Sequence, residues 1–383
     1  MGSIDLELTL TEDQTMLGEA VERLVREQHD FAARRAAIES DAGWIKDFWH
    51  QLAELGILGA AIPEEFGGLG GGAIMTMLVM QSFGKGLVIA PYVPTIVCAA
   101  GLIARAGSPE QRNEHLPAIL DGSRIFAFAC SERNDQGDLG RLRTTAARDG
   151  NSYRINGEKS LVIGASWAEW IIVVARLTGA SEEAAVGAFI LPAQAKGISV
   201  RSHRTIDGWS ASEIQFDNVI VDPGAMIGTA EGGYALIEQI IDDATAALCA
   251  EAGGAIDALL SATVSYAKTR KQFGQPIGKF QVLQHRMVDM LIARDQAISI
   301  SHLACVNLNA EPRIRQKAVS AAKAHIGTIG RRAAQAAVQI HGGIGITDEL
   351  DVSHYFRRLE VINIQFGSVD HHIQRYAELQ NHT

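Results

Sequence analysis

The sequence predicts a mainly helical protein with a central β domain. Apolar residues recur at helical spacing through the first third of the chain and again through its last two fifths. Between these regions the pattern changes to short runs typical of β-strands. A chain of 383 residues is too long for one simple core, so we expect several packed units. We place three domains at residues 1–121, 122–228 and 229–383.

Composition narrows the class of protein. Apolar residues make up 47% of the chain and charged residues 20%, as in an ordinary soluble globular protein. The net charge is −10 and no basic block is present, so we do not expect nucleic-acid binding. The N-terminus shows no signal-peptide pattern. The four cysteines lie far apart and give no metal or disulfide spacing, so we expect no metal and a reducing, cytoplasmic location. They are Cys98, Cys130, Cys249 and Cys305.

The first third of the chain reads as a series of helices. Thr11 followed by Gln14 predicts a capping box at the first helix, whose apolar face contains Leu17 and Val21. The glycine-rich stretch 59–72 lacks the patterns of a phosphate-binding loop, so we interpret it as a connector.

One uncharged run, residues 86–104, is long enough to raise the question of a membrane span. It contains Pro91 and Pro94, and it is the only such run in the chain. We therefore expect a buried helix beginning near one of these prolines, and no membrane association.

The middle of the chain reads as a small β domain. Strands are predicted at 126–130, 170–175, 186–191, 198–202 and 213–221. Asn156-Gly157 separates two short apolar runs, a pattern that predicts a β-hairpin.

Long helices follow, and a basic corner joins the first two. Helices are predicted at 234–270, 281–308, 313–340 and 371–379. The first helix ends at Arg270, the chain bends at Gly274 and Pro276, and the next helix begins shortly after. The guanidinium of Arg270, the amide of Gln281 and the ring of Phe273 suit a flat, anionic ligand. The alternative is a plain helix corner with a surface arginine.

Three segments, taken in order, resemble signatures of the acyl-CoA dehydrogenase flavoprotein family: residues 55–70, 266–290 and 339–347. The resemblance implies an N-terminal helical domain, a β-barrel-like middle and a C-terminal four-helix bundle. It also implies an FAD-dependent oxidoreductase acting on an acyl-CoA substrate, with an electron-transfer flavoprotein or similar acceptor as partner.

The resemblance also implies which residues bind FAD, some of them across two subunits. These are Phe128, Cys130, Ser131, Ile163, Arg270, Phe273, Gln281, Gln339, Gly342 and Gly343. Gly137 takes the place of the family's substrate-side serine in the loop 133–138. The family's stacking Trp and donor Thr are replaced by Leu161 and Ile163. For Gly342-Gly343 the alternative is an ordinary turn at a helix C-terminus.

The family's catalytic base is missing from both of its known positions. Phe366 and Ala244 stand where family members carry a glutamate. Glu251 lies seven residues after Ala244, on the same apolar helix face and about 10 Å away, so we predict that Glu251 is the base. The alternative is a buried ion pair with an arginine such as Arg286 or Arg294.

Two aspartates are further candidates. Asp370, just after Phe366, is a second candidate base. Asp242 aligns with a residue near CoA, so we predict that it binds substrate; the alternative is a solvated acid on the opposite helix face.

Three functional hypotheses follow. The first is α,β-dehydrogenation of an acyl-CoA with FAD. The second is a base-lacking partner subunit, because the ending at 366–372 resembles the small or β-type subunits that act on pimeloyl-type or steroid side-chain thioesters. The third is a flavin oxidase on the same fold, similar to nitroalkane oxidase. We expect a homo-oligomer or an α2β2 assembly with a homologous subunit.

Overall fold

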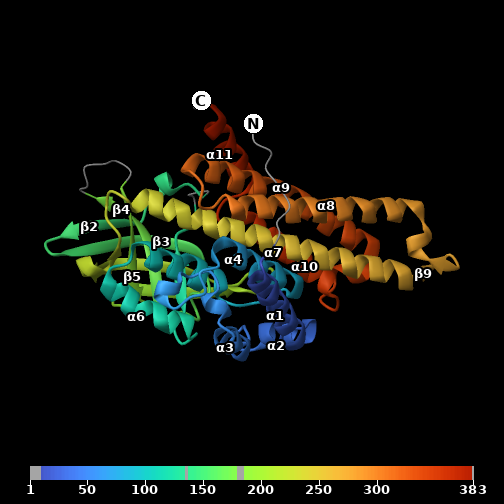
Figure 1. The fold of residues 1–383 in the computed structure, drawn as a ribbon, viewed down its shortest axis with the longest axis horizontal. Helices are drawn as coiled ribbons and strands as arrows, with labels where there is room; N and C mark the ends of the chain where they lie inside the picture. Colours follow the sequence, from blue (N-terminus) through green and yellow to red (C-terminus); the bar gives the residue numbers. More distant parts are fainter. Residues whose placement is uncertain (1–9, 134–136, 179–184, 382–383) are drawn as a thin grey trace.

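The computed structural model describes residues 10–133, 137–178 and 185–381. The β region lies at one end of an elongated molecule, and the longest helices extend from it to the opposite end (Figure 1). The predicted order of helical, β and helical regions is confirmed. The three domain boundaries given above remain a proposal.

The N-terminal region is helical. Its α-helices are α1 (Glu12–Gln28), α2 (Phe31–Glu39), α3 (Lys46–Glu54), α4 (Gly72–Gly86), α5 (Gly101–Ala106) and α6 (Pro109–Leu120). The capping box of Thr11 and Gln14 is present at the start of α1. The uncharged run folds as a buried π-helix, Val93–Ala100, that continues into α5. This confirms the buried helix predicted near Pro91 or Pro94.

The middle region is one sheet. Its strands are β1 (Phe126–Ala129), β2 (Thr145–Asp149), β3 (Ser152–Ile163), β4 (Trp170–Thr178), β5 (Val186–Pro192), β6 (Ile198–Arg204), β7 (Ser210–Val221) and β8 (Met226–Ile227). The order is β6-β7-β3-β2-β4-β5-β8, with β1 parallel to β4. Its face toward the helices joins the main core, whereas residues such as Ile155, Val173 and Phe189 form a second, smaller core.

The hairpin predicted at Asn156-Gly157 is wrong, because β3 runs through both residues. Gly157 (φ 144°) instead lies at an irregularity in the pairing with β7, and a Cβ there would come within 2.6 Å of the Cα of Thr144. The turn of the hairpin is formed earlier, by Gly150 and Asn151, which connect β2 to β3.

The C-terminal region consists of α7 (Gly233–Thr269), α8 (Gln281–Val306), α9 (Pro312–His341), α10 (Asp351–Ile364) and α11 (Val369–Asn381). Helices α7 to α10 pack together as a bundle, and α11 packs on α9. Within the described residues, α7 is the one helix long and apolar enough to cross a membrane, but 72% of its most apolar stretch is buried inside the protein. It is therefore a core helix.

Glycines bring α4 and α7 into backbone contact. A Cβ on Gly84 would lie 1.9 Å from the carbonyl oxygen of Glu251, and a Cβ on Gly254 would lie 2.0 Å from that of Gln81. No larger residue fits at these two positions without separating the helices. The contact fixes the N-terminal helices against the middle of α7.

Candidate active site

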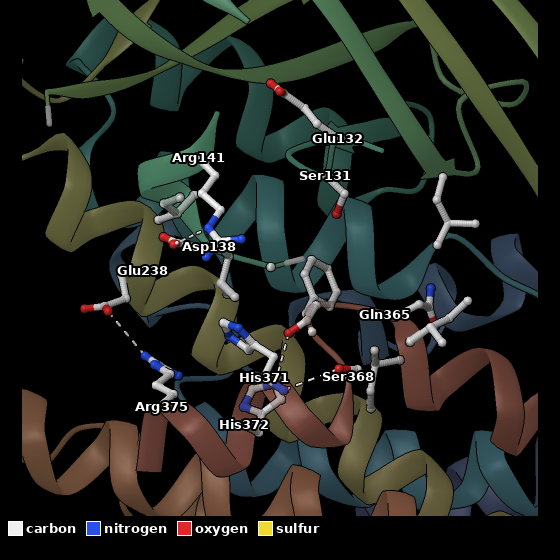
Figure 2. A pocket seen from close by; sticks show the side chains of 18 of the residues that line it. Ser131, Glu132, Asp138, Arg141, Glu238, Gln365, Ser368, His371, His372 and Arg375 are labelled. Carbon is white, nitrogen blue, oxygen red and sulfur yellow. Dashed lines mark hydrogen bonds and ion pairs between the residues drawn. The ribbon is translucent and has the colours of Figure 1, made fainter. Parts of the chain in front are cut away.

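A cavity of about 950 Å³ lies where the sheet meets the helical bundle. The end of β1 and the strand β3 form one wall, the beginning of α7 forms another, and the turn between α10 and α11 closes it (Figure 2). The volume is within the range of cofactor and ligand sites.

The turn between α10 and α11 is the most unusual part of the wall. Phe366 has a positive φ of 53°, which is costly for a residue with a side chain, and Gly367 follows at 105°. Both residues line the cavity. Such a conformation persists only where surrounding contacts hold it.

Two buried side chains hold this turn: Lys323, behind the cavity wall, and His372, which also lines the cavity. The ammonium of Lys323 donates to the carbonyl oxygens of Ile362 at 2.6 Å and Gln365 at 2.5 Å. The Nε2 of His372 lies 3.0 Å from the carbonyl oxygen of Phe366. A carbonyl can only accept, so we assign the proton of His372 to Nε2. The carbonyls at the end of α10 are thereby satisfied by side chains.

The N–H groups of the same turn are not satisfied in this way. Among the residues that the structure describes, the N–H groups of Phe366 and Gly367 have no hydrogen-bond partner. Gly367 is buried, and an unpaired buried N–H is rare in native structures. The turn therefore offers two donors at the cavity wall.

Burial sets the charge states behind the turn. It lowers the pKa of Lys323 to about 8, so its ammonium is still charged at neutral pH. Burial, together with the charge of Lys323, holds the pKa of His372 well below its usual range, so this imidazole is neutral. Lys323 faces the charge of Arg358 from α10, and His372 has Arg375 and His371 beside it on its own helix.

Glu251 forms a buried ion pair. Its two carboxylate oxygens accept from Nε and Nη2 of Arg358 at 2.5 and 2.7 Å, and its side chain is 2% exposed. The partner is thus neither Arg286 nor Arg294, because Arg294 pairs with Asp257 instead. The cavity wall includes Arg358 and not Glu251.

Arg358 connects Glu251 to a wider network. It also donates to Asp207 at 3.0 Å, and its guanidinium lies 4.5 Å from the ring centre of Trp209, which lines the cavity. Arg34, from α2, donates to the carbonyl of Asp207 at 2.7 Å. The network joins α2, α7, α10 and the β6–β7 turn, and so fixes this corner of the cavity.

Asp242 is fully buried and is not a solvated acid. Its oxygens pair with Arg315 at 2.8 Å and Arg375 at 2.6 Å. The same Arg375 contacts Glu238, which lines the cavity, at 3.3 Å (Figure 2). Asp242 therefore lies just behind the wall, and its role in substrate binding remains a prediction.

Four of the predicted site residues line the cavity: Phe128, Ser131, Ile163 and Gly137. Leu161 lines it with them. Cys130 is buried next to this wall without lining it. Residues 134–136 of the predicted loop lie outside the described residues.

The other six predicted cofactor residues lie elsewhere, at the exposed corner beyond α7. Phe273 is 90% exposed, and Arg270, Gln281, Gln339 and the pair Gly342-Gly343 are exposed as well. The ring of Tyr266 stacks on His341 at 4.3 Å, so the ends of α7 and α9 meet there. Gly342 does end α9, and a Cβ at either glycine would meet nothing.

The corner and the cavity are too far apart to share one ligand within a chain. Leu248, the last α7 residue that lines the cavity, precedes Arg270 by 22 residues, which corresponds to about 33 Å along a helix. This exceeds the length of an extended dinucleotide. Residues of both groups can contact one ligand only if a second chain brings its corner to this cavity.

Most carboxylates around the cavity already form ion pairs with arginine or lysine side chains. Glu132 pairs with Lys159, Asp138 with Arg141 and Glu213 with Arg133. Within the described part of the chain, Asp370 is the cavity carboxylate without a hydrogen bond or ion pair. No group of side chains that suits a metal ion is found among the described residues.

Sequence patterns missed Lys323, His372 and Arg358. A signal existed for Lys323, because it lies in an apolar stripe with Val319 and Ile326, where a lysine is out of place. No pattern points to Arg358 as the partner of Glu251, since 107 residues separate the two.

Comparison with known proteins assigns nearly the whole chain to one family. The N-terminal, middle and C-terminal domain profiles of acyl-CoA dehydrogenases match residues 11–123, 127–219 and 231–379. A probable acyl-CoA dehydrogenase of Bacillus subtilis, YngJ, is 30% identical over 373 residues, covering 96% of this chain and 97% of that protein.

Two solved structures are similar over almost their full length. The ChsE4-ChsE5 complex from Mycobacterium tuberculosis is 26% identical, with a TM-score of 0.90, covering 99% of this chain and 100% of that one. The steroid acyl-CoA dehydrogenase variant Tcur3481-Tcur3483 is 29% identical, with a TM-score of 0.88, covering 97% and 98%.

Proposed function

Since the chain belongs to the acyl-CoA dehydrogenase family, whose members are FAD-dependent oxidoreductases acting on CH–CH bonds, we propose that it dehydrogenates an acyl-CoA thioester between Cα and Cβ in the cavity described above. One observation carries the proposal. The predicted flavin-side residues and a turn with two unpaired N–H donors line the same cavity.

The residues present fit FAD. Phe128, Leu161 and Ile163 offer an apolar wall for a flat ring, and Ser131 adds a hydroxyl. The open backbone at Gly342-Gly343 and the guanidinium of Arg270 suit the phosphates and adenosine. Bound FAD supplies the hydride acceptor, its N5 atom.

The chain's own contribution begins at the substrate carbonyl. Removing the α-proton of a thioester places negative charge on the carbonyl oxygen. The N–H groups of Phe366 and Gly367 are donors of the kind that stabilise such an oxygen. Leu248 and Ile241 of α7 provide apolar lining for an acyl group.

Which residue accepts the α-proton is still a prediction. Glu251 acts as the base only if Arg358 releases it, because both of its oxygens are engaged. Asp370 already lines the cavity and has no partner among the described groups, so geometry favours it over Glu251. Comparing the E251Q and D370N variants separates the two: loss of substrate-driven flavin reduction with retained FAD identifies the acceptor.

A second candidate function has its own support. Phe366 occupies the position of the usual glutamate, and Glu251 is held by Arg358. A partner subunit that completes FAD sites without supplying a base needs neither carboxylate. One of the similar structures named above is the ChsE4-ChsE5 complex, and the other also carries two chain names, Tcur3481-Tcur3483.

In both proposals two chains share each FAD site, as a homo-oligomer or as α2β2 with a homologous subunit. The separation between the cavity and the corner around Arg270 supports this arrangement. An electron-transfer flavoprotein or similar acceptor then reoxidises the flavin.

A bulky acyl group, such as a steroid side chain, suits the cavity because Leu161 replaces a larger tryptophan. We also propose a reducing, cytoplasmic location, because the four cysteines are buried and widely spaced in the sequence.

Anaerobic titration tests the function. The chain is purified alone and with a homologous sister chain, loaded with FAD, and mixed with acyl-CoA thioesters of increasing bulk. Bleaching of the flavin by the chain alone supports the dehydrogenase. Bleaching only with the sister chain supports the partner subunit, and protein that takes up no FAD in either form contradicts both.

A further inference from the structure

Lys323 and His372 have no role in the chemistry described so far, although both bind the turn at the cavity. Lys323 is 1% exposed and His372 is 1% exposed. Among the described residues, Lys323 has no carboxylate partner. A buried ammonium without a counter-charge is costly, so its retention calls for an explanation.

The geometry of the peptide group suggests why a charged Lys323 is kept at this position. A trans peptide directs its C=O and its N–H in opposite directions. The carbonyl of Gln365 faces Lys323, so the N–H of Phe366, in the same peptide, faces away from Lys323. The carbonyl of Phe366 faces His372, so the N–H of Gly367 faces away from His372. Each unpaired donor of the turn thus lies opposite one buried side chain.

The same contacts strengthen the donors. When the carbonyl of a peptide accepts a hydrogen bond, its N–H becomes more positive and a better donor. The full charge of Lys323 adds to this effect, because charges act strongly where water is excluded. His372 contributes without a charge, since it is neutral, and Ser320 at 3.3 Å orients its ring through Nδ1.

We propose that Lys323 and His372 are positioning residues that aim and polarise the Phe366 and Gly367 N–H groups at the thioester oxygen of the substrate. The inference rests on the proposed function, because it assigns the turn to the thioester carbonyl. Lys323 lies behind the cavity wall, whereas His372 also lines the cavity. The role that we assign to both acts through the peptide groups of the turn.

A chromophoric ligand tests this directly. An aromatic α,β-unsaturated acyl-CoA absorbs at longer wavelength when its thioester oxygen accepts strong hydrogen bonds. We expect its band to shift to longer wavelength on binding to the FAD-loaded protein, prepared with a sister chain where loading requires one. In K323M the shift falls by at least half and Kd rises about tenfold.

Matched variants separate polarisation from general damage. Lys317 lies on the same helix without a hydrogen bond to another described residue, so K317M keeps the full shift. H372Q retains an N–H donor for the Phe366 carbonyl and keeps most of the shift, whereas H372L loses it. Circular dichroism and thermal unfolding confirm that each variant is folded.

The outcomes are distinct. If unchanged protein loads FAD but does not bind the probe, the proposed function fails and this inference fails with it. If unchanged protein shows the shift and folded K323M shows the same shift, the inference alone is overturned. If K323M does not fold, the histidine pair decides: loss in H372L with retention in H372Q supports the inference, and equal shifts in both overturn it.

Discussion

The two ends of α7 lie in opposite environments. From Gly233 to Leu260 most of the helix is buried, and the charges it meets there, such as Arg358 and Arg315, are paired with its own acids. Past Thr269 the chain turns into a corner whose arginine and phenylalanine face solvent. The charges at the first end are paired within one chain, whereas the second end is exposed, and we propose that another chain completes it. The following experiments test this contrast, in order of expected effect.

The largest effect is expected at Arg358. R358L leaves the buried carboxylates of Glu251 and Asp207 without their cation, so we expect the free energy of unfolding to fall by about 4 kcal/mol. Urea unfolding measures the change. The neighbouring R357L breaks a pair with the exposed Asp348 and two hydrogen bonds to Ser353, and should cost only about 1 kcal/mol. Equal losses of unfolding free energy in the two variants would mean that the buried ion pairs stabilise the fold no more than the exposed pair does.

A pH dependence is expected from His29. Burial lowers its pKa to about 4 in the folded protein, against 6.5 in the unfolded chain. Between these values the unfolded chain binds a proton that the folded protein does not. Stability should therefore fall as pH drops from 6.5 to 4, by about 3 kcal/mol, and His29 adds no pH dependence above that window.

The variant H29Q tests this through urea unfolding at several pH values. It should make the acid limb shallower without removing it, because burial also lowers the pKa of His354 and His372, whereas H50Q, at an exposed histidine, should keep the limb of the unchanged protein. A limb as steep in H29Q as in the unchanged protein would contradict the contribution of His29.

Two adjacent glycines give a smaller and sharper test. A Cβ on Gly254 overlaps the backbone of Gln81, so G254A should destabilise by about 2 kcal/mol. On Gly253 the nearest atom is 3.8 Å away, so G253A should stabilise slightly, by about 0.5 kcal/mol, through helix propensity. Thermal unfolding compares them, and the same sign in both would mean that α4 and α7 are not in backbone contact.

The smallest effect on stability is expected at the exposed corner. F273A should change the free energy of unfolding by less than about 0.5 kcal/mol, because the ring is 90% exposed. Its affinity for FAD should fall about tenfold, because we propose that this ring contacts the FAD bound in the cavity of a second chain. V306A, at the opposite end of α8, is the control. Unchanged FAD affinity in F273A would contradict the shared site.

Local patterns predicted the long helices and the Arg270 corner, because periodicity and the Gly274–Pro276 bend act over a few residues. They did not predict α10, which has no side-chain cap and interrupts its apolar face with His354 and Arg358. The hairpin prediction took Gly157 for a turn residue, whereas its lack of a side chain serves a close approach to Thr144.

The candidate site was predictable only in part, for the same reason. The resemblance aligned Phe128, Ser131 and Ile163 with residues beside the flavin, and all three line the cavity. The partners of Glu251 and Asp242, and the support of the Phe366 turn by Lys323, depend on contacts between distant helices. No spacing along one helix contains that information.

The unbroken length of α7 has a mechanical consequence. Its 37 residues form a single rod about 55 Å long, with Tyr234 in the cavity wall at one end and Arg270 just beyond the other. A rotation of one degree about its cavity end displaces the far end by about 1 Å, enough to make or break a hydrogen bond. In the shared site that we propose, a small movement of α7 on filling one cavity would therefore change the contacts of the Arg270 corner with the dinucleotide in the neighbouring chain.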